Sequence, residues 1–244
     1  SSGPSASSGR RQEGRLGQAE VAAVVLAAGA STRFGQCKQL IDWGGKPLLA
    51  HVTDLALQAG FDPVIVVLGC QAEETYAALA DRPVRTLMNW RWEQGMSTSV
   101  QTGLTAVPPK AEGALFLQCD QPRITVDLLQ AIVERFEQTE ALIVHPTHDG
   151  RRGTPVLFAR HLFPKLSAVT GDEGGRGLIE RHPEEIATVT VDDRAVLADI
   201  DTPADYEQLR ASTDASQRRS SASVLRPIRH AVIDMDGVLW RGGE

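Results

Sequence analysis

The chain has 244 residues, 42% of them hydrophobic and 23% charged, enough for one large domain with attached segments. Its 25 Lys and Arg against 31 Asp and Glu give a net charge of −6, which argues against broad nucleic-acid or anionic-membrane binding but allows a local basic pocket. No apolar run reaches the roughly 18–20 residues that span a bilayer. From the net charge and the missing apolar run together, we expect neither nucleic acid nor a membrane as a partner. Three widely spaced cysteines without a C-x-x-C pair favour a reducing cytoplasm over a disulfide framework.

Short apolar runs that end at turn residues recur along the chain. They follow a start rich in Ser, Gly and Arg, which we interpret as a disordered tail over residues 1–19. Such runs are typical of strands that are buried on both faces of a parallel sheet. In chain order they cover residues 21–28, 63–68, 113–118, 141–144 and 188–191.

Segments with helical spacing lie between these runs, at residues 47–59, 72–80, 98–106 and 126–137. The alternation predicts an α/β fold, with a mostly parallel sheet covered by helices on both faces. Ligands of such sheets bind at the carboxyl ends of the strands. The residues that directly follow each strand are therefore the first candidates for a functional site.

The pattern changes near the end of the chain. Thr202 and Pro203 indicate the start of a last helix, and residues 20–211 are predicted to form one domain. Residues 212–228 are polar, rich in Ser and Arg and without periodicity, so we interpret them as a linker. Residues 229–244 then begin a different unit, with a new apolar strand followed by the motif DMDG.

The loop after the first strand reads LAAGASTRFGQCKQL at residues 26–40. Its small residues let a ligand approach the backbone closely. Arg33 and Lys38 add a fork of donors and a mobile point charge, a combination that suits a triphosphate. The loop is neither a Walker A motif nor G-x-G-x-x-G, because Ser31 stands where the second Gly would be. On this loop alone, a glycine-rich turn with solvated basic side chains is an equal alternative.

Carboxylates occur at two further places in the sequence. Asp120 comes directly after the third apolar run, where it is well placed to hold Mg²⁺, although a turn cap before Pro122 is the alternative for this residue alone. Asp199 and Asp201 form a second acidic site, in which alternation places both on one side of an extended segment. Asp201 is equally suited to cap the helix that follows.

These motifs together resemble a known family, the molybdenum cofactor nucleotidyltransferases, and specifically its cytidylyltransferase branch. The matching stretches occur in the family's order along the domain: LAAGASTRFGQCKQL, GGKPLL, VVLG, NWRWEQGMSTSV, CDQP, GRRGTPVLF, GDEGGRGL and DIDTPADY. The resemblance implies a Rossmann-like nucleotidyltransferase fold and an enzyme that transfers CMP from CTP to the molybdopterin cofactor, releasing pyrophosphate. Two stretches are similar to the cytidylyl branch. One is LAAG, where the guanylyltransferase branch typically has LAGG, and the other is GMSTS.

The resemblance also implies a set of site residues. Catalytic roles go to Arg33, Lys38 and Asp120, and Asp120 and Asp201 are expected to hold Mg²⁺ as cofactor. The nucleotide is expected to contact Leu26, Ala27, Ala28, Gly29, Arg33, Lys38, Gly69, Asn89 and Ser97. The acceptor is expected to contact Arg151, Arg152, Gly153, Thr154, Asp172 and Arg176. The family often has His where this chain has Thr154, so the acceptor is less firmly indicated than the nucleotide.

Three alternatives stay open for the function. The chain could be a guanylyltransferase that acts on the same cofactor with GTP, or a nucleotidyltransferase for another phosphorylated small molecule. It could also be a binding module that hands the cofactor to a recipient molybdoenzyme. The presence of Arg33, Lys38, Asp120 and Asp201 favours an enzyme.

The DMDG motif resembles the first motif of haloacid-dehalogenase-type phosphatases. The resemblance implies Asp234 as nucleophile and Asp236 as general acid and base, with Mg²⁺ as cofactor. Eight residues follow Asp236, far fewer than such a domain needs, so we expect a truncated start without phosphatase activity in these 244 residues. A longer parent protein could carry that second activity.

Overall fold

The computed structural model describes residues 19–224, 232–233 and 239–240. The chain falls into two compact units, of which the first ends at Asp201 and the second begins at Thr202. The predicted tail, apart from Ala19, lies outside the described residues. None of the helices in the described part combines the length and apolar character that crossing a membrane requires.

The first unit is built on one eight-stranded sheet. One side of it is a parallel set of four strands in the order β3-β2-β1-β4, formed by Arg85–Met88, Val64–Leu68, Val21–Ala27 and Gly113–Gln118. β7 (Val156–Ala159) then pairs antiparallel with both β4 and β5 (Ile143–His148). The far edge is made by the short β6 (Arg151–Arg152), antiparallel to β5, and by β8 (Ile186–Thr190), parallel to β5.

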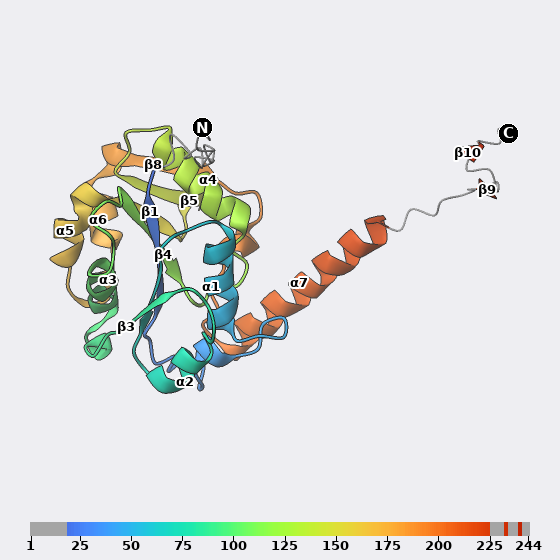
Figure 1. Cartoon of the computed structure of the whole chain (residues 1–244), viewed down its shortest axis with the longest axis horizontal. Coiled ribbons are helices and arrows are strands. Elements are labelled where there is room, and N and C mark those ends of the chain that lie inside the picture. The colour runs from blue at the N-terminus through green and yellow to red at the C-terminus, as the bar shows by residue number, and fades with distance from the viewer. Residues whose placement is uncertain (1–18, 225–231, 234–238, 241–244) are drawn as a thin grey trace, which may run out of the picture. The chain divides into compact units, whose positions relative to one another are not determined.

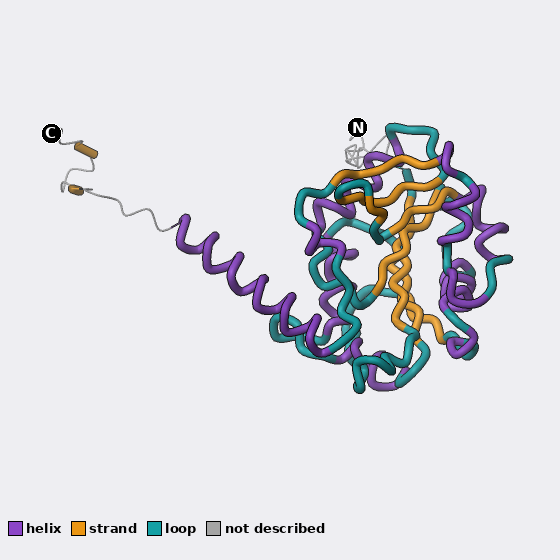
Figure 2. Tube along the Cα trace, turned by 180° about the vertical axis from the view of Figure 1, so that it is seen from behind, coloured by secondary structure: helices purple, strands orange, loops and turns teal. Residues whose placement is uncertain are grey.

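Helices cover both faces of this sheet, as Figures 1 and 2 show. On one face α3 (Met96–Leu104) packs on β1 and β2 and against α5 (Phe163–Ser167), with α6 (Arg176–Arg181) beside them. The other face carries α1 (Leu48–Gln58) on β1 and β2, and α4 (Val126–Glu137) on β5, β7 and β8. The short α2 (Ala72–Ala77) follows β2.

This arrangement confirms the predicted α/β class, a mostly parallel sheet with flanking helices. Apolar runs such as VIVVL in β2 are buried along their whole length, because helices cover both faces. The core between the sheet and α3, α5 and α6 includes Val24, Ile65, Phe116 and Phe158. Gly103 lets α3 lie close to the sheet, since a Cβ there would come within 2.5 Å of Val24 Cγ1.

The second unit contains one long helix, α7 (Pro203–Val224). Thr202 and Asp205 cap its start reciprocally: Asp205 Oδ2 accepts from the Thr202 amide at 2.7 Å, and Thr202 Oγ1 accepts from the Asp205 amide at 3.3 Å. This helix includes residues 212–224, which the sequence alone indicated as part of a linker. Further along, the two-residue strands Val232–Ile233 (β9) and Leu239–Trp240 (β10) pair antiparallel.

Candidate active site

The loop after β1 is held open by a buried glutamine, Gln39, which is 4% exposed. Its Nε2 donates to Ala27 O at 3.0 Å and to Gly29 O at 2.8 Å. Its Oε1 accepts from the Ser31 hydroxyl at 3.2 Å, and Ser31 has a left-handed backbone with φ of 56°. Gln39 therefore fixes the path of the small-residue loop, a role that its place in the sequence does not reveal.

Two acidic segments meet at the end of β4. The amide of Ile200 donates to Asp120 O at 2.9 Å, which draws the segment 199–201 alongside Asp120. Ile200 is fully buried, whereas Asp199 and Asp201 line the same cavity as Asp120. Segments almost 80 residues apart thus bring three carboxylates to one strand end.

Lys38 and Arg33 pair with these carboxylates. Lys38 Nζ lies 2.7 Å from Asp120 Oδ2, 2.7 Å from Ile200 O and 3.3 Å from Asp201 Oδ1. Arg33 Nη1 lies 2.9 Å from Asp201 Oδ2, and its side chain is 77% exposed. Burial alone would lower the pKa of Lys38, but the charges of Asp120 and Asp201 outweigh burial and raise it, so Lys38 is a firmly charged ammonium.

The cavity that these residues share has a volume of about 660 Å³. Its floor is the loop after β1, from Leu26 to Arg33, together with the strand end at Gln118–Asp120. Another part of its wall includes Trp92, Glu93, Met96 and Ser99. Of the residues expected at the nucleotide, six line this cavity: Leu26, Ala27, Ala28, Gly29, Arg33 and Lys38.

Three other residues expected at the nucleotide lie behind the wall. Asn89 is 2% exposed, and its amide donates to Thr98 Oγ1 at 2.8 Å and to Ser99 Oγ at 3.0 Å. Ser97 is 1% exposed and does not line the cavity, whereas Ser99 does. Gly69 backs the loop so closely that a Cβ on it would lie 2.7 Å from Ala28 O. These three positions support the wall, and direct nucleotide contact by them stays a prediction.

A second cavity of about 310 Å³ continues from the first, and the two share Leu26, Met96, Gln118, Asp172, Arg176 and Asp199. Phe116 and Phe158 give it an apolar wall, with their ring centroids 6.0 Å apart. Of the residues expected at the acceptor, five line it: Arg152, Gly153, Thr154, Asp172 and Arg176. Arg151 is exposed on β6 and lines neither cavity.

Asp199 lines both cavities, and Gln121, its hydrogen-bond partner, lines the second. Gln121 is 1% exposed, and its Nε2 donates to Asp199 Oδ1 at 2.6 Å and to Thr154 Oγ1. Asp199 counts among the exposed residues, but its carboxylate lies within the cavity wall. Partial burial, assisted by the nearby charge of Asp120, raises the pKa of Asp199 to about 6.

Asp172 joins the loop before α6 to the start of α3. Its Oδ1 accepts from the Met96 amide at 3.2 Å, so the carboxylate caps the first turn of α3. A Cβ at Gly95 would lie 2.6 Å from that oxygen, so only glycine permits the close approach. Asp172 thus has a structural partner, and Arg176 beside it offers a cation to both cavities.

The residues present fit a divalent cation at Asp120 and Asp201. Oδ1 of Asp120 is buried and has no hydrogen-bond partner among the described residues, an arrangement that is costly for a carboxylate oxygen. No group of three or more His, Cys, Asp or Glu side chains poised to hold a metal occurs in residues 19–224 or in the other described segments. Mg²⁺ commonly takes one or two protein carboxylates and completes its shell with water and substrate phosphates.

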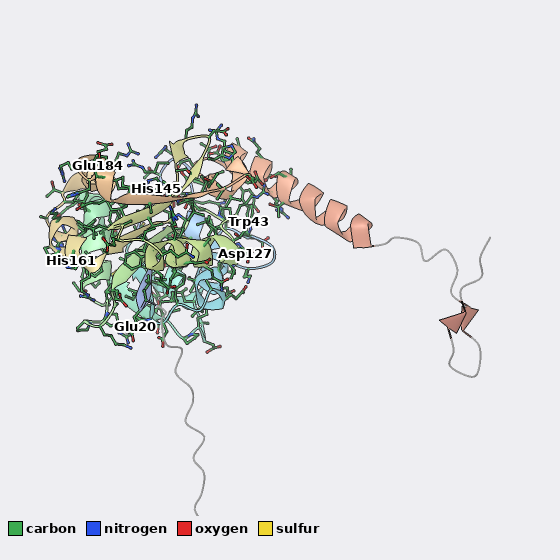
Figure 3. The ribbon with its side chains drawn as sticks, turned by 90° about the horizontal axis from the view of Figure 1, so that it is seen from above. Glu20, Trp43, Asp127, His145, His161 and Glu184 are labelled. Carbon is green, nitrogen blue, oxygen red and sulfur yellow. The ribbon has the colours of Figure 1, made fainter. Side chains whose placement is uncertain are left out.

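Other chemically suggestive residues lie elsewhere. His145 is buried within β5 in the body of the fold (Figure 3), where its Nδ1 contacts Pro146 O at 3.1 Å, and it lines neither cavity. Asp234 and Asp236 lie outside the described residues, so the phosphatase-like interpretation of that segment stays a prediction.

Several known proteins are similar to this chain. It is 29% identical over 189 residues to the nicotine blue oxidoreductase of Paenarthrobacter nicotinovorans, covering 75% of this chain and 92% of that protein. It is 26% identical over 185 residues to the molybdenum cofactor cytidylyltransferase of Escherichia coli K12, covering 75% and 92%. It is 31% identical over 165 residues to the molybdenum cofactor guanylyltransferase of Vibrio cholerae, covering 66% and 76%.

Among solved structures, the Rv0371c protein of Mycobacterium tuberculosis H37Rv has a TM-score of 0.71 and 31% identity, over 80% of this chain and 99% of that one. A structure of the same protein in complex with manganese has a TM-score of 0.68. The family of MobA-like NTP transferase domains matches residues 23–186. This range includes every lining residue of both cavities except Leu197, Asp199 and Asp201. The chain is therefore a nucleotidyltransferase and belongs to the family of MobA-like NTP transferase domains.

Proposed function

We propose that this nucleotidyltransferase transfers CMP from CTP to the molybdopterin cofactor, with release of pyrophosphate. The observation that carries the proposal is the cluster of Lys38, Asp120 and Asp201 beside the small-residue loop, in a family that includes a molybdenum cofactor cytidylyltransferase. We also propose Mg²⁺ as the metal and the cytoplasm as the compartment. Delivery of the product to a recipient molybdoenzyme belongs to the same proposal.

The first cavity suits a nucleoside triphosphate. Ala27, Ala28 and Gly29 present backbone with little side chain, so phosphates can approach the loop amides. Lys38 and Arg33 supply the cations for the triphosphate, and Gln39 keeps the loop in place. Such fixed charges lower the barrier of a nucleotidyl transfer because negative charge builds up on the leaving pyrophosphate.

The second cavity suits an acceptor with a flat body and a phosphate. Phe116 and Phe158 offer an apolar wall for a ring, and Arg152 and Arg176 offer cations for the phosphate. Because the two cavities share lining residues, ligands bound in them would lie next to each other, and the acceptor phosphate would be able to attack the α-phosphorus of CTP. A phosphate is already largely ionised near neutral pH, and the reaction needs no dedicated general base.

The residues of this chain would act by binding and orientation. Asp120 and Asp201 would hold Mg²⁺, which when bound neutralises phosphate charge in the transition state. Lys38 and Arg33 would orient the triphosphate, and Arg176, which lines both cavities, would hold the acceptor phosphate next to it. Gln121 would keep Asp199 and Thr154 at fixed positions in the lining of the second cavity.

Pyrophosphate release tests this proposal. The full chain is incubated with Mg²⁺ and molybdenum cofactor, and with CTP or GTP in parallel. We expect release with CTP and at least tenfold less with GTP. The reverse preference would make the protein a guanylyltransferase. Tight cofactor binding without release for either nucleotide would overturn the enzyme assignment to this cofactor and favour a cofactor-binding chaperone.

The substitution Asp120→Asn tests the role of the carboxylate. We expect it to lower kcat about 100-fold or more, on the scale of removing one electrostatic group that stabilises a transition state. Asp192→Asn is the matched control, because Asp192 is exposed and lines neither cavity, and its kcat should match the parent protein. Turnover by Asp120→Asn that is unchanged at limiting Mg²⁺ would remove Asp120 from the metal site.

A further inference from the structure

The ammonium group of Lys38 is surrounded by oxygen acceptors. An ammonium has three N–H donors, and its Nζ lies within hydrogen-bond distance of three oxygens: Asp120 Oδ2, Ile200 O and Asp201 Oδ1. The side chain is 14% exposed, so water contributes little to its solvation. Arg33 differs, because it touches only the outer oxygen of Asp201 in these contacts and is 77% exposed.

The oxygens around Lys38 are the kind that a hard divalent cation prefers, two carboxylates and one backbone carbonyl. A divalent cation that bound Asp120 and Asp201 would lie next to the ammonium, and two positive charges a few ångströms apart in a partly buried site repel each other strongly. Oδ1 of Asp120 remains open to the cation, but Asp120 Oδ2 and Asp201 Oδ1 cannot serve the cation and Lys38 Nζ at the same time.

We propose that Lys38 is a built-in counter-cation, which occupies one oxygen of Asp120 and one of Asp201 until metal and triphosphate arrive together. Metal alone must displace the ammonium into a poorly solvated position without a partner. When a triphosphate is present, its oxygens accept the hydrogen bonds that Lys38 gives up. Metal and nucleotide consequently bind with positive cooperativity, and Lys38 is the residue that couples them.

Neutralisation by Lys38 also protects the empty site from its own charges. Asp120, Asp199 and Asp201 line the same cavity, and Lys38 Nζ lies 2.7 Å from Asp120 Oδ2 and 3.3 Å from Asp201 Oδ1. Removing the ammonium leaves these carboxylates facing each other, which increases the attraction for any divalent cation. Removal of Lys38 therefore raises the affinity for a divalent cation in two ways, because it frees oxygens and because it leaves negative charge unbalanced. A control must separate these two effects.

Manganese binding without nucleotide tests the proposal. Mn²⁺ titrations followed by electron paramagnetic resonance on the full chain give the dissociation constant directly. We expect Lys38→Met and Lys38→Gln to bind Mn²⁺ at least tenfold more tightly than the parent protein. Equal or weaker binding by both variants, with thermal unfolding showing that they are folded, would overturn the proposal.

Two controls separate occupancy from charge. Arg33→Met removes a neighbouring positive charge but leaves Lys38 in place, and we expect less than a threefold gain in Mn²⁺ affinity. Lys110→Met removes a lysine that pairs with Glu20 outside the cavities, and it should change nothing. A gain for Arg33→Met equal to that for Lys38→Met would show a general charge effect and overturn the proposal.

The coupling is measured with CTP and Mn²⁺ in the absence of any acceptor. In the parent protein, CTP should lower the dissociation constant of Mn²⁺ at least tenfold, after correction for the Mn²⁺ that free CTP binds. In Lys38→Met, the same addition of CTP should lower this constant less than threefold. The inference rests on the proposed nucleotide site, but its nucleotide-free titrations are independent of turnover. Failure of pyrophosphate release with an intact Lys38 effect would reject the function alone, whereas the opposite result would reject the inference alone.

Discussion

Gly69 shows how one missing side chain shapes the nucleotide loop. A Cβ at this position would lie 2.7 Å from Ala28 O, 2.8 Å from Ala28 Cβ and 2.9 Å from Trp92 Cβ. None of these atoms is the tip of a flexible side chain, so the backbone of the loop must shift to admit a methyl group. The glycine thus sets the separation between the loop after β1 and the wall that carries Trp92.

We expect Gly69→Ala to lower the free energy of unfolding by about 1–3 kcal/mol, the usual range for overpacking. Gly29→Ala is the matched control. Its φ is not in the left-handed region and a Cβ there meets nothing within 4 Å, so it should leave stability unchanged or raise it by about 0.4–1 kcal/mol. Urea unfolding of both variants checks this. Equal changes in the free energy of unfolding would show that the close contact with Ala28 does not destabilise Gly69→Ala.

Part of the site could be predicted at the level of single residues. Asp120 was predicted because it directly follows an apolar run, Lys38 because it adds a cation to a loop of small residues, and Asp201 because it lies in an acidic segment. The structure brings these three together. Gln39 and Ser99 were missed because a glutamine in a loop and a serine in a helix have many ordinary roles. Their importance depends on neighbours far along the chain, which a single sequence does not reveal.

At the scale of elements, α4 has the most clearly defined start. Thr125 has an extended backbone and accepts a hydrogen bond on its side-chain oxygen from the amide of Leu128 at 3.1 Å, and Asp127 adds a negative charge in the first turn. The apolar face of the helix buries Leu128, Leu129 and Ile132. Cap and apolar face together explain why residues 126–137 were predicted with the observed bounds.

We expect Thr125→Ala to reduce the free energy of unfolding by about 1 kcal/mol, because the Leu128 amide loses its acceptor. Thr125→Ser keeps the hydroxyl and should lose less than half as much. Thermal unfolding in parallel distinguishes the two variants, since about 1 kcal/mol corresponds to about 2–4 °C in a chain of this size. A serine variant as unstable as the alanine variant would assign the effect to the threonine methyl group.

The elements that were not predicted are short or depend on distant partners. β7 has four apolar residues after a proline and lies antiparallel between β4 and β5, a placement that no local pattern indicates. β3 is an edge strand whose residues are partly exposed, so it lacks the continuous apolar run of β1 and β2. In α7, the Ser- and Arg-rich residues after 212 lack apolar periodicity, although such residues are compatible with a helix.

At the scale of the whole molecule, the distribution of charge matters more than the net value of −6. Lys38, Arg33 and Arg176 gather at the carboxyl ends of β1 and β4 and at the adjoining cavity, where carboxylates balance them. An acidic protein can therefore present a local cationic surface to phosphates without binding polyanions in general. Elsewhere, ion pairs tie separate segments of the first unit together.

Asp54 is the centre of such a link. From α1 its carboxylate accepts from Arg82 Nε at 2.6 Å and Nη2 at 3.1 Å, and from Lys46 Nζ at 2.6 Å. Arg82 follows α2 and Lys46 precedes α1, so three segments meet at one side chain that is 19% exposed. Burial opposes ionisation of Asp54, but the hydrogen bonds from Arg82 and Lys46 outweigh it and lower the pKa of Asp54 from its ordinary value.

A lowered pKa in the folded state means that the unfolded chain binds protons more readily, so Asp54 stabilises the fold above its unfolded pKa of about 3.9 and loses this effect as the pH falls through the folded value. We expect Asp54→Asn to lower the free energy of unfolding by about 1–3 kcal/mol at pH 7, the range for hydrogen bonds to charged groups. Urea unfolding at pH 7, 5 and 3 should show the deficit intact at pH 5 and smaller at pH 3, where the parent protein begins to lose the same ion pairs. Asp192→Asn, at an exposed site, should follow the parent protein throughout. A deficit that is the same at all three pH values would mean that Asp54 stabilises the fold by packing and neutral hydrogen bonds, independently of its charge.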